Sequence, residues 1–237
     1  MKLYLILSAF VFTFQLFAQK DTNYFQQEVI YDIRVNLNDK QHQIDGSEKS
    51  GSGTIVRDGV SLSALISQEL YLRNIRAKRD KPGLRAQHLK GVQACAELCQ
   101  GKLEGAEVGS REIRFWPGKK IIGGNFNWDI GTAGSTTMLA SIILPLALFS
   151  QKPSTYRITG GLFQDFAPSA FHLKYVLFPI LKEMGADLDL EIIQPGYVPR
   201  GGGVIEIKAR PLKDRLKPLT LIDQGKITEI KGIALSS

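Results

Sequence analysis

The stretch between Arg73 and Leu89, RNIRAKRDKPGLRAQHL, holds the side chains best suited to binding a phosphate. Guanidinium and ammonium groups are followed there by an amide and an imidazole: Arg73, Arg76, Lys78, Arg79, Lys81, Arg85, Gln87 and His88. A guanidinium can donate two parallel hydrogen bonds to phosphate oxygens, whereas a lysine ammonium acts as a point charge. Taken alone, the stretch fits a solvated cationic face equally well. The anion-site interpretation therefore depends on the rest of the chain.

Local patterns place this stretch at a strand edge, a turn and a helix start. Alternation over residues 71–75 predicts a strand, Pro82-Gly83 predicts a turn, and a helical pattern follows from Leu84. Upstream, the Gly/Ser-rich segment 44–53 leads into a helix predicted over Thr54–Ile66, which carries Arg57. Backbone amides beside a helix N-terminus can cradle phosphate, although a flexible loop is the commoner explanation of such a segment.

Composition favours a globular chain with an anionic partner. The 237 residues suffice for one or two domains, and 43% hydrophobic with 22% charged residues is ordinary for a folded protein. The net charge of +7 and the pI near 9.4 favour nucleic acid or a nucleotide as the partner. Cys95 and Cys99 share one face of a predicted helix, where we expect reduced core residues.

The first 43 residues have a different character. Residues 1–19 form a signal-like segment, with an apolar run from Leu3 to Ala18. A secretory signal peptide and an upstream extension fit this segment equally well, and the run is too short and too polar to predict a membrane span. Residues 20–43 form a polar leader with one predicted strand, Val29–Val35.

Helices and strands then recur in a broadly similar order. After a helix over Leu89–Leu98, strands are predicted at 103–108, 112–116 and 126–130, followed by an apolar helix over Thr136–Phe149. A strand at 156–159, a helix at 169–184 and strands at 187–193 and 204–209 complete the second set. The recurrence predicts an α/β protein built from repeated units. A last strand is predicted at 226–235.

Several short motifs in a fixed order carry a family resemblance. They are IDGS at 44–47, IRAKRDKPGLRAQHL at 75–89, LEGAEVGS at 103–110, TAGS at 132–135, GG at 160–161, AP at 167–168, GYVPRGGG at 196–203 and K-I-x-x-I-x-G at 226–232. From about Ile44 to its end, the chain resembles RNA 3'-terminal phosphate cyclases. Each motif is weak by itself, and their common order makes the resemblance specific.

The resemblance implies a fold and a domain organisation. We expect an α/β (α+β) fold with repeated units of two helices on a four-stranded sheet. The repeated α/β domain would cover residues 44–225, and residues 226–237 would begin a small inserted domain. The family's third unit and most of its inserted domain have no counterpart in this sequence.

The resemblance also implies an activity. These enzymes use ATP and a divalent metal, Mg or Mn, to convert an RNA 3'-phosphate into a 2',3'-cyclic phosphate. A histidine is adenylylated, AMP passes to the RNA phosphate, and the neighbouring 2'-hydroxyl attacks and expels AMP. The family's adenylylated histidine lies beyond the position that matches Ser237. We therefore expect this chain alone to be inactive. The alternative, favoured by Ser50 and Ser141, is a non-catalytic protein that binds RNA 3'-phosphate ends.

Positions that match the family's motifs supply a predicted phosphate site. The resemblance assigns Arg57, Arg76, Arg79, Gln87 and His88 to it. Several arginines are needed there because a terminal phosphate and a triphosphate must share one pocket. Without the resemblance, Arg57 would be interpreted as a surface arginine, and His88 as a surface or hydrogen-bonding residue.

The predicted nucleotide and metal positions include departures from the family. Pro168 matches a position beside the adenine, whereas Ser141 replaces a glutamine that contacts the nucleotide. His172 replaces an aromatic residue near the base, and Ser50 replaces a glutamate that helps to bind metal. Serine lacks the negative charge that a hard divalent cation prefers. These changes favour either phosphate binding with weakened ATP handling, or a longer relative of which this sequence is one part.

The resemblance implies a cytoplasmic protein whose partner is RNA with a 3'-terminal phosphate, without stable membrane contact. The signal-like segment 1–19 keeps a secreted or periplasmic phosphate-recognising α/β domain as an alternative. ATP is scarce outside the cytoplasm, so export would argue against an ATP-dependent activity.

Overall fold

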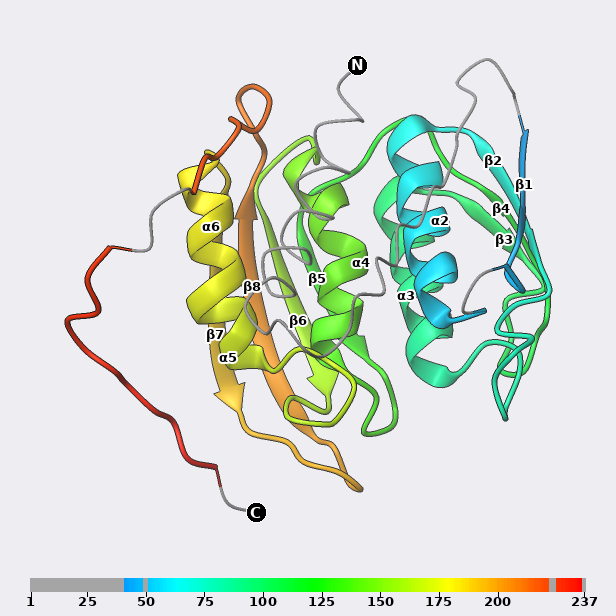
Figure 1. Ribbon diagram of the computed structural model, residues 1–237. Helices are drawn as coiled ribbons and strands as arrows, with labels where there is room; N and C mark the ends of the chain where they lie inside the picture. The colour runs from blue at the N-terminus through cyan, green and yellow to red at the C-terminus, as the bar shows by residue number, and fades with distance from the viewer. Residues whose placement is uncertain (1–40, 49–50, 222–224, 236–237) are drawn as a thin grey trace.

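Two α/β units lie side by side in the computed structural model (Figure 1), which describes residues 41–48, 51–221 and 225–235. The predictions for residues 1–40, among them the signal-like segment and the strand Val29–Val35, lie outside the described residues, as does Ser50. Among the helices described here, none combines the length and the apolar character that a membrane crossing requires.

The first unit follows the order strand, helix, strand, helix, strand, strand. Its elements are β1 (Gln41–Asp45), α2 (Gly53–Ile66), β2 (Glu69–Arg73), α3 (Ala86–Cys99), β3 (Lys102–Glu104) and β4 (Ile113–Trp116). The sheet order is β1-β2-β4-β3, in which β1 and β2 are parallel and the other neighbours are antiparallel.

The second unit repeats this topology. Its elements are β5 (Asn125–Asp129), α4 (Thr136–Leu148), β6 (Ser154–Gly160), α5 (Ala170–His172), the π-helical segment η1 (Leu173–Leu177), α6 (Phe178–Glu183), β7 (Asp187–Gln194) and β8 (Gly203–Arg210). The sheet order is β5-β6-β8-β7, again with only the first pair parallel. The prediction of repeated units, each with helices on a four-stranded sheet, is confirmed.

Three segments differ from their predictions. The strand β1 includes residues 41–43, which were expected in the polar leader; it lies at a sheet edge, where polar side chains can face water. Residues 226–235 form no strand, since no neighbouring strand pairs with them in the described chain, and they extend away from the body (Figure 1). The strand predicted at 103–108 ends at Glu104, because Gly105 turns the chain with a φ of 71°.

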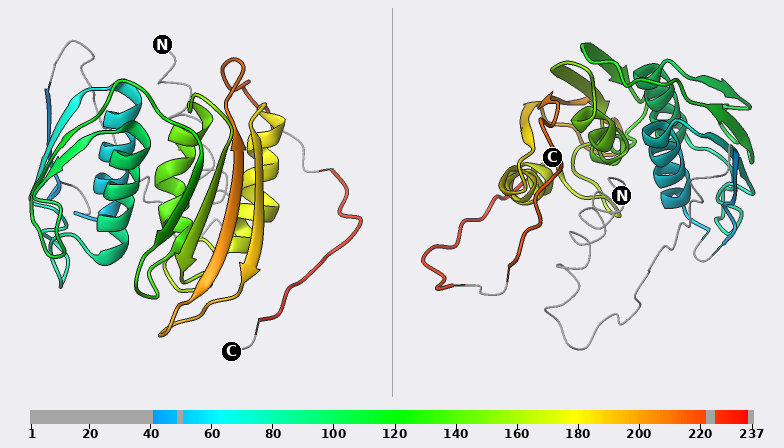
Figure 2. Two further views of the ribbon diagram at one scale, coloured as in Figure 1. Left: turned by 180° about the vertical axis from the view of Figure 1, so that it is seen from behind. Right: turned by 90° about the horizontal axis from the view of Figure 1, so that it is seen from above.

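The helices pack on one face of each sheet and against one another (Figure 2). At the α3–α4 crossing, Gly91 leaves room for Ile142. The Ser61 hydroxyl of α2 donates to the Ile142 carbonyl at 2.9 Å, which ties α2 to α4. One hydrophobic core runs through both units, and it includes Cys95 and Cys99 as buried free thiols whose pKa values are raised by burial.

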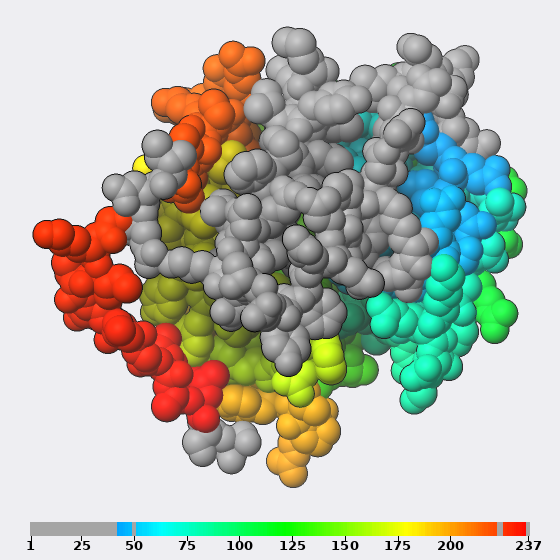
Figure 3. Space-filling model, in the orientation of Figure 1, coloured from blue at the N-terminus to red at the C-terminus, as the bar shows by residue number. Residues whose placement is uncertain are grey.

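This topology brings four loops to one edge of the molecule. In each unit the parallel strands end at the same edge, so the loops that follow them, 46–52, 74–85, 130–135 and 161–169, start there. The helices α2, α3 and α4 begin at this edge, which is the lower one in Figure 1. In the space-filling view, the loop after β2 (teal) and the turn between β7 and β8 (amber) lie at the surface of that edge (Figure 3).

Candidate anion-binding site

The loop over residues 74–85 displays its cations from a rigid frame. Ile75 and Leu84 anchor its two ends and are fully buried. The Ile75 amide donates to the Arg111 carbonyl at 2.9 Å, and the Leu84 amide donates to the Ser110 carbonyl at 2.9 Å. Between these anchors, Lys78, Arg79, Lys81 and the following Arg85 are exposed.

Arg76 stiffens this loop from within. Its Nη1 donates to the Lys81 carbonyl at 2.7 Å and to the Gly83 carbonyl at 2.8 Å. The residue is half-buried and has a φ of 52°, in the left-handed region that non-glycine residues rarely adopt. Burial lowers the pKa of Arg76, and the neighbouring Arg85 and Arg79 lower it further. The three guanidinium groups therefore lie close enough to repel one another.

Asp45 fastens the loop after β1 to the loop after β2. Its Oδ1 accepts hydrogen bonds from the Ser47 amide at 2.9 Å and from the Ser47 hydroxyl at 2.6 Å. Its Oδ2 accepts from Asn74 Nδ2 at 3.0 Å and lies 3.5 Å from Arg73 Nε. The Ser47 bonds are the main reason why the pKa of Asp45 is lowered. The carboxylate thus holds both loops in place as an anion.

His88 fills the space between α2 and α3 with its ring. It is only 5% exposed, and its Nδ1 accepts from the Arg85 amide at 3.3 Å. Burial lowers the pKa of His88 to about 3, and Arg76, Arg57 and Arg85 act in the same direction. The imidazole is therefore neutral at pH 7, and because Nδ1 accepts, the proton lies on Nε2.

Gly53 is required by this histidine. A Cβ atom at residue 53 would overlap His88 Nε2 and lie within 2.7 Å of Cδ2. Gly53 is the first residue of α2, and Ser52 caps that helix by accepting from the Thr54 amide at 3.3 Å. The imidazole N–H thus lies against the N-terminus of α2, where helix N–H groups and the helix dipole favour an anion.

Arg57 joins the same group from the second turn of α2. Its Nη2 donates to Thr54 Oγ1 at 2.8 Å, which orients the guanidinium. Its positive charge acts to lower the pKa of His88. Asp58 follows, and burial raises the pKa of its carboxyl to about 6, although Arg57 acts in the opposite direction.

Gln87 connects the two units. Its Oε1 accepts from the Ser135 amide at 3.0 Å, at the N-terminus of α4. A Cβ atom at Gly134 would lie 3.1 Å from the Gln87 Cβ, so the backbone of the 130–135 loop passes close to α3. The structure shows its oxygen engaged in aligning α3 with α4, whereas the phosphate contact that the resemblance predicts would be made through the amide nitrogen.

The predicted nucleotide residues lie around Thr137 of α4. The Thr137 hydroxyl donates to the Pro168 carbonyl at 2.6 Å, and the Ser141 hydroxyl donates to the Thr137 carbonyl at 2.9 Å. His172 is half-buried in α5, and burial lowers its pKa. The structure therefore brings Pro168 and Ser141 to one helix turn, with the Ser141 hydroxyl bonded to its own helix.

The described residues offer no metal-ligating group. Over residues 41–48, 51–221 and 225–235, no three His, Cys, Asp or Glu side chains converge. A divalent ion prefers several oxygen ligands with negative charge. We therefore assign no residue here to a metal and derive no step through one.

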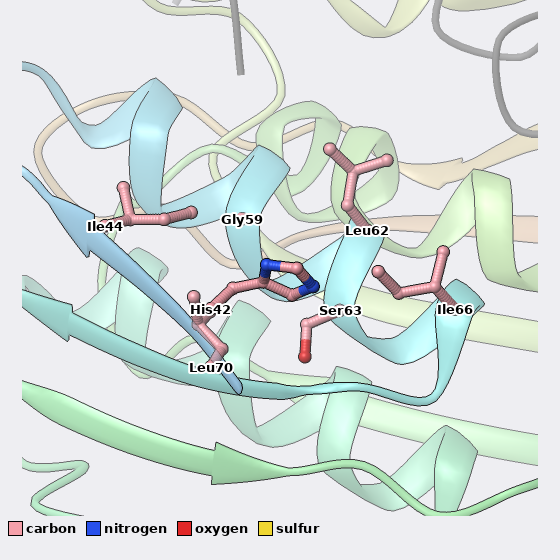
Figure 4. Close-up of a pocket in the computed structure, with 7 residues that line it drawn as sticks. All are labelled: His42, Ile44, Gly59, Leu62, Ser63, Ile66 and Leu70. Carbon is pink, nitrogen blue, oxygen red and sulfur yellow. The ribbon is translucent and has the colours of Figure 1, made fainter. Parts of the chain in front are cut away.

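A small pocket elsewhere in the first unit is not connected with these residues. It lies between β1 and α2 and is lined by His42, Ile44, Gly59, Leu62, Ser63, Ile66 and Leu70 (Figure 4). His42 Nε2 is hydrogen-bonded to Gln68 Oε1. The lining is mainly apolar and lacks the arginines of the site.

Two residues outside the five that the resemblance assigned also belong to the site. Arg85 lies in the basic stretch, and its backbone and charge both act on His88. Its position immediately before Ala86-Gln87-His88 was the available signal. The sequence does not indicate that residue 53 must be glycine. Its lack of a side chain becomes necessary only when α2 packs against His88 of α3. Together, the arginines, the neutral imidazole N–H and the start of α2 can bind a dianion such as a terminal phosphate.

Comparison with known proteins gives one consistent result. The family model described as RNA 3'-terminal phosphate cyclase matches residues 48–231. Proteins of that name from Staphylothermus marinus and Archaeoglobus fulgidus are 41% and 45% identical, covering 81% and 71% of this chain but 54% and 51% of their own lengths. One from Nitrosospira multiformis is 42% identical and covers 80% of this chain and 53% of its own length.

The chain thus spans about half the length of the curated relatives that it matches. A solved EPSP synthase from Acinetobacter baumannii covers 74% of this chain and 49% of its own, with 14% identity and a TM-score of 0.33. That likeness is too low to support an argument.

Proposed function

Because this chain belongs to the RNA 3'-terminal phosphate cyclase family, we propose that its cationic site binds RNA 3'-phosphates for ATP-dependent conversion into 2',3'-cyclic phosphates. The observation that carries the proposal is the buried His88 imidazole packed against the N-terminus of α2, beside the rigid loop that displays the cations. A solvated cationic face would spread its charges over the surface instead. Here one buried, neutral imidazole feels the charges of Arg76, Arg57 and Arg85, all of which lower its pKa.

Each side chain has a distinct task in this proposal. The guanidinium groups offset the two charges of the terminal phosphate and reduce the repulsion that an attacking oxygen would meet. Arg79, which is exposed on the rigid loop, is free to pair with phosphate oxygens in a bidentate manner. His88 donates its Nε2 proton near the start of α2, so it orients the phosphate without changing its protonation state.

The terminal phosphate must be activated before the 2',3'-cyclic phosphate can form. A phosphate oxygen of the RNA end takes the adenylyl group, which derives from ATP with release of diphosphate. The neighbouring 2'-hydroxyl then attacks the phosphorus of the RNA phosphate, loses its proton and expels AMP. The cluster described here would hold the terminal phosphate still through both steps. ATP would bind beside Pro168 and His172, where α4 and α5 begin at the same edge as the cationic loop.

A second candidate function rests on Ser141. Its hydroxyl is bonded to the Thr137 carbonyl, so it replaces a long nucleotide-contacting side chain by a short one that is already engaged. A protein that binds RNA 3'-phosphate ends without converting them would keep the arginine cluster and lose the need for ATP. We place either protein in the cytoplasm, where RNA ends and ATP are available.

The proposal is tested with matched arginine variants. Arg79→Ala should weaken binding to RNA with a 3'-phosphate by about tenfold or more, because a charge-assisted hydrogen bond contributes about 1.5–3 kcal/mol. Arg157→Ala, which removes an exposed arginine from the middle of β6, is the control and should change little. Fluorescence anisotropy with RNAs ending in phosphate or hydroxyl measures both. Equal losses on the two RNAs would show that Arg79 only contacts the RNA backbone.

A conversion assay separates the two candidates. RNA labelled at its 3'-phosphate becomes resistant to phosphatase when the cyclic phosphate forms. ATP-dependent resistance in the presence of this chain supports the enzyme. Binding of the 3'-phosphate RNA without any binding of ATP supports the non-catalytic protein.

A further inference from the structure

A row of aromatic rings lies on the second unit at the edge where the loops gather. The ring centroids of Phe163 and Phe171 are 5.1 Å apart, and those of Phe171 and Tyr175 are 6.0 Å apart, with near-parallel planes in both pairs. Tyr197 extends the row on the other side, 5.6 Å from Phe163. The inner rings are half-buried, but Tyr175 at the outer end is 58% exposed.

Phe166 lies in the loop after β6, three residues along the chain from Phe163. Its side chain is fully exposed, at 101%. Its φ of 61° lies in the left-handed region, which is a genuine outlier for a bulky residue. Exposed apolar area and backbone strain both cost stability, and strained residues cluster at sites that clamp ligands. Packing does not explain this ring, because it buries nothing.

The row is continuous with the cationic site. Ser135, whose amide is bound by Gln87, pairs with Gly161 at the start of the loop that carries Phe163 and Phe166. Pro168, near the end of that loop, accepts a hydrogen bond from Thr137 in the first turn of α4. Ser135 therefore contacts both the loop that carries Phe163 and the α3 residue Gln87.

We propose that Phe166 and Tyr175 form a stacking platform for the RNA bases that precede the terminal phosphate. The inference rests on the proposed function for the RNA end and adds a second contact region to it. Aromatic side chains stack on every kind of base, so such a platform binds single-stranded RNA without sequence preference. Lys174 lies beside Tyr175, with Nζ 5.8 Å from the ring centroid, and supplies a positive charge for the phosphates between those bases.

An open platform suits a strand of bases better than one base. Pockets that hold a single small ligand enclose most of its surface. Phe166 and Tyr175 instead present exposed rings along the edge, with a cation alongside. A protein partner would need apolar area around these rings, whereas Asp165, next to Phe166, and Lys174, next to Tyr175, are charged.

The test compares RNA lengths. Competition assays would measure the binding of uridine 3'-monophosphate and of a six-uridine RNA ending in a 3'-phosphate to the 237-residue chain. Phe166→Ala and Tyr175→Ala should each weaken the longer RNA by about fivefold to a hundredfold, the range of a lost base stack. Both variants should leave the mononucleotide unchanged, and Phe166→Trp should retain wild-type binding. Trp116→Ala is the control, because it also removes an aromatic ring that lies near a lysine, Lys102, but at the opposite edge of the first sheet. It should not change the affinity for either RNA.

The outcomes separate this inference from the proposed function. The platform would be overturned if Phe166→Ala and Tyr175→Ala bound the longer RNA as tightly as the wild type. It would also be overturned if these variants lost affinity for the mononucleotide, or for ATP, by the same factor as for the longer RNA. Equal wild-type affinity for phosphate and hydroxyl ends would overturn the phosphate site. The length-dependent loss would still support the platform in that case, because stacking does not depend on the terminal phosphate.

Discussion

Replacing Gly53 by alanine tests how the cationic site is assembled. The added methyl group would lie within 2.7 Å of His88 Cδ2 and 3.1 Å of Cε1 and would overlap Nε2. Because the imidazole is only 5% exposed, it has no free space into which to turn. Overpacking of this kind costs about 1–3 kcal/mol, so Gly53→Ala should unfold at lower urea concentration than the wild type.

The same helix supplies a matched control. At Gly59 a Cβ would lie 3.4 Å from Ile44 Cδ1 and 3.7 Å from Leu70 Cδ2, which are ordinary contacts. Alanine is a better helix former than glycine by about 1 kcal/mol. Gly59→Ala should therefore be as stable as the wild type or more stable, although the chemical change is identical.

A double-mutant cycle completes the argument. In a His88→Ala background the ring is gone, so Gly53→Ala should no longer destabilise, and the coupling between the sites should be about 1–3 kcal/mol. Urea unfolding followed by the fluorescence of Trp116 and Trp128 measures all four proteins. If Gly53→Ala is as stable as Gly59→Ala, or if the two changes are additive, the packing of His88 against α2 has been misjudged.

Two further predictions concern His88 and Gln87. The pKa of His88 in the folded protein is about 3, below the ordinary value of 6.5. The unfolded chain therefore binds a proton more readily, and the stability that the neutral imidazole contributes above pH 6.5 is lost as the pH falls towards 3. Between pH 7 and pH 5 the wild type should lose about 2 kcal/mol of unfolding free energy relative to His88→Gln. The raised pKa of Asp58 makes the unfolding free energy change with pH in the opposite direction, but it does so equally in both proteins and cancels in the difference. If the unfolding free energies of wild type and His88→Gln run parallel with pH, the account of His88 is contradicted. Gln87→Ala should cost about 1 kcal/mol, because the Ser135 amide loses its acceptor. Gln93 is exposed on the same helix, so Gln93→Ala is the control and should not change the urea unfolding free energy. If Gln87→Ala and Gln93→Ala are equally stable, the hydrogen bond between Gln87 and Ser135 does not contribute to stability.

The order of elements along the chain was sufficient to predict the repeated units. Apolar periodicity is local, so the helices Thr54–Ile66 and Thr136–Phe149 were placed within about two residues of α2 and α4. The strand β1 was missed because Gln41, His42 and Gln43 lack an apolar alternation at a sheet edge. The strand predicted at 226–235 was wrong because alternation alone cannot supply a partner strand.

The candidate site was predictable in composition but not in its contacts. Residue types pointed to the basic stretch around Arg76, and the family resemblance assigned His88 and Arg57 to the same predicted phosphate site. The bond from the Ser135 amide to Gln87 and the packing of His88 on Gly53 join residues far apart in sequence. Such contacts depend on how the helices pack, which no local pattern records.

The measurement that tests the central claim most directly is the ratio of wild-type affinities for one RNA ending in a 3'-phosphate and in a 3'-hydroxyl. A phosphate held by several guanidinium groups should make the first bind at least about tenfold more tightly at moderate salt, since each charge-assisted contact contributes about 1.5–3 kcal/mol. Equal affinities would contradict the account and reduce the arginine cluster to a surface that binds any RNA backbone.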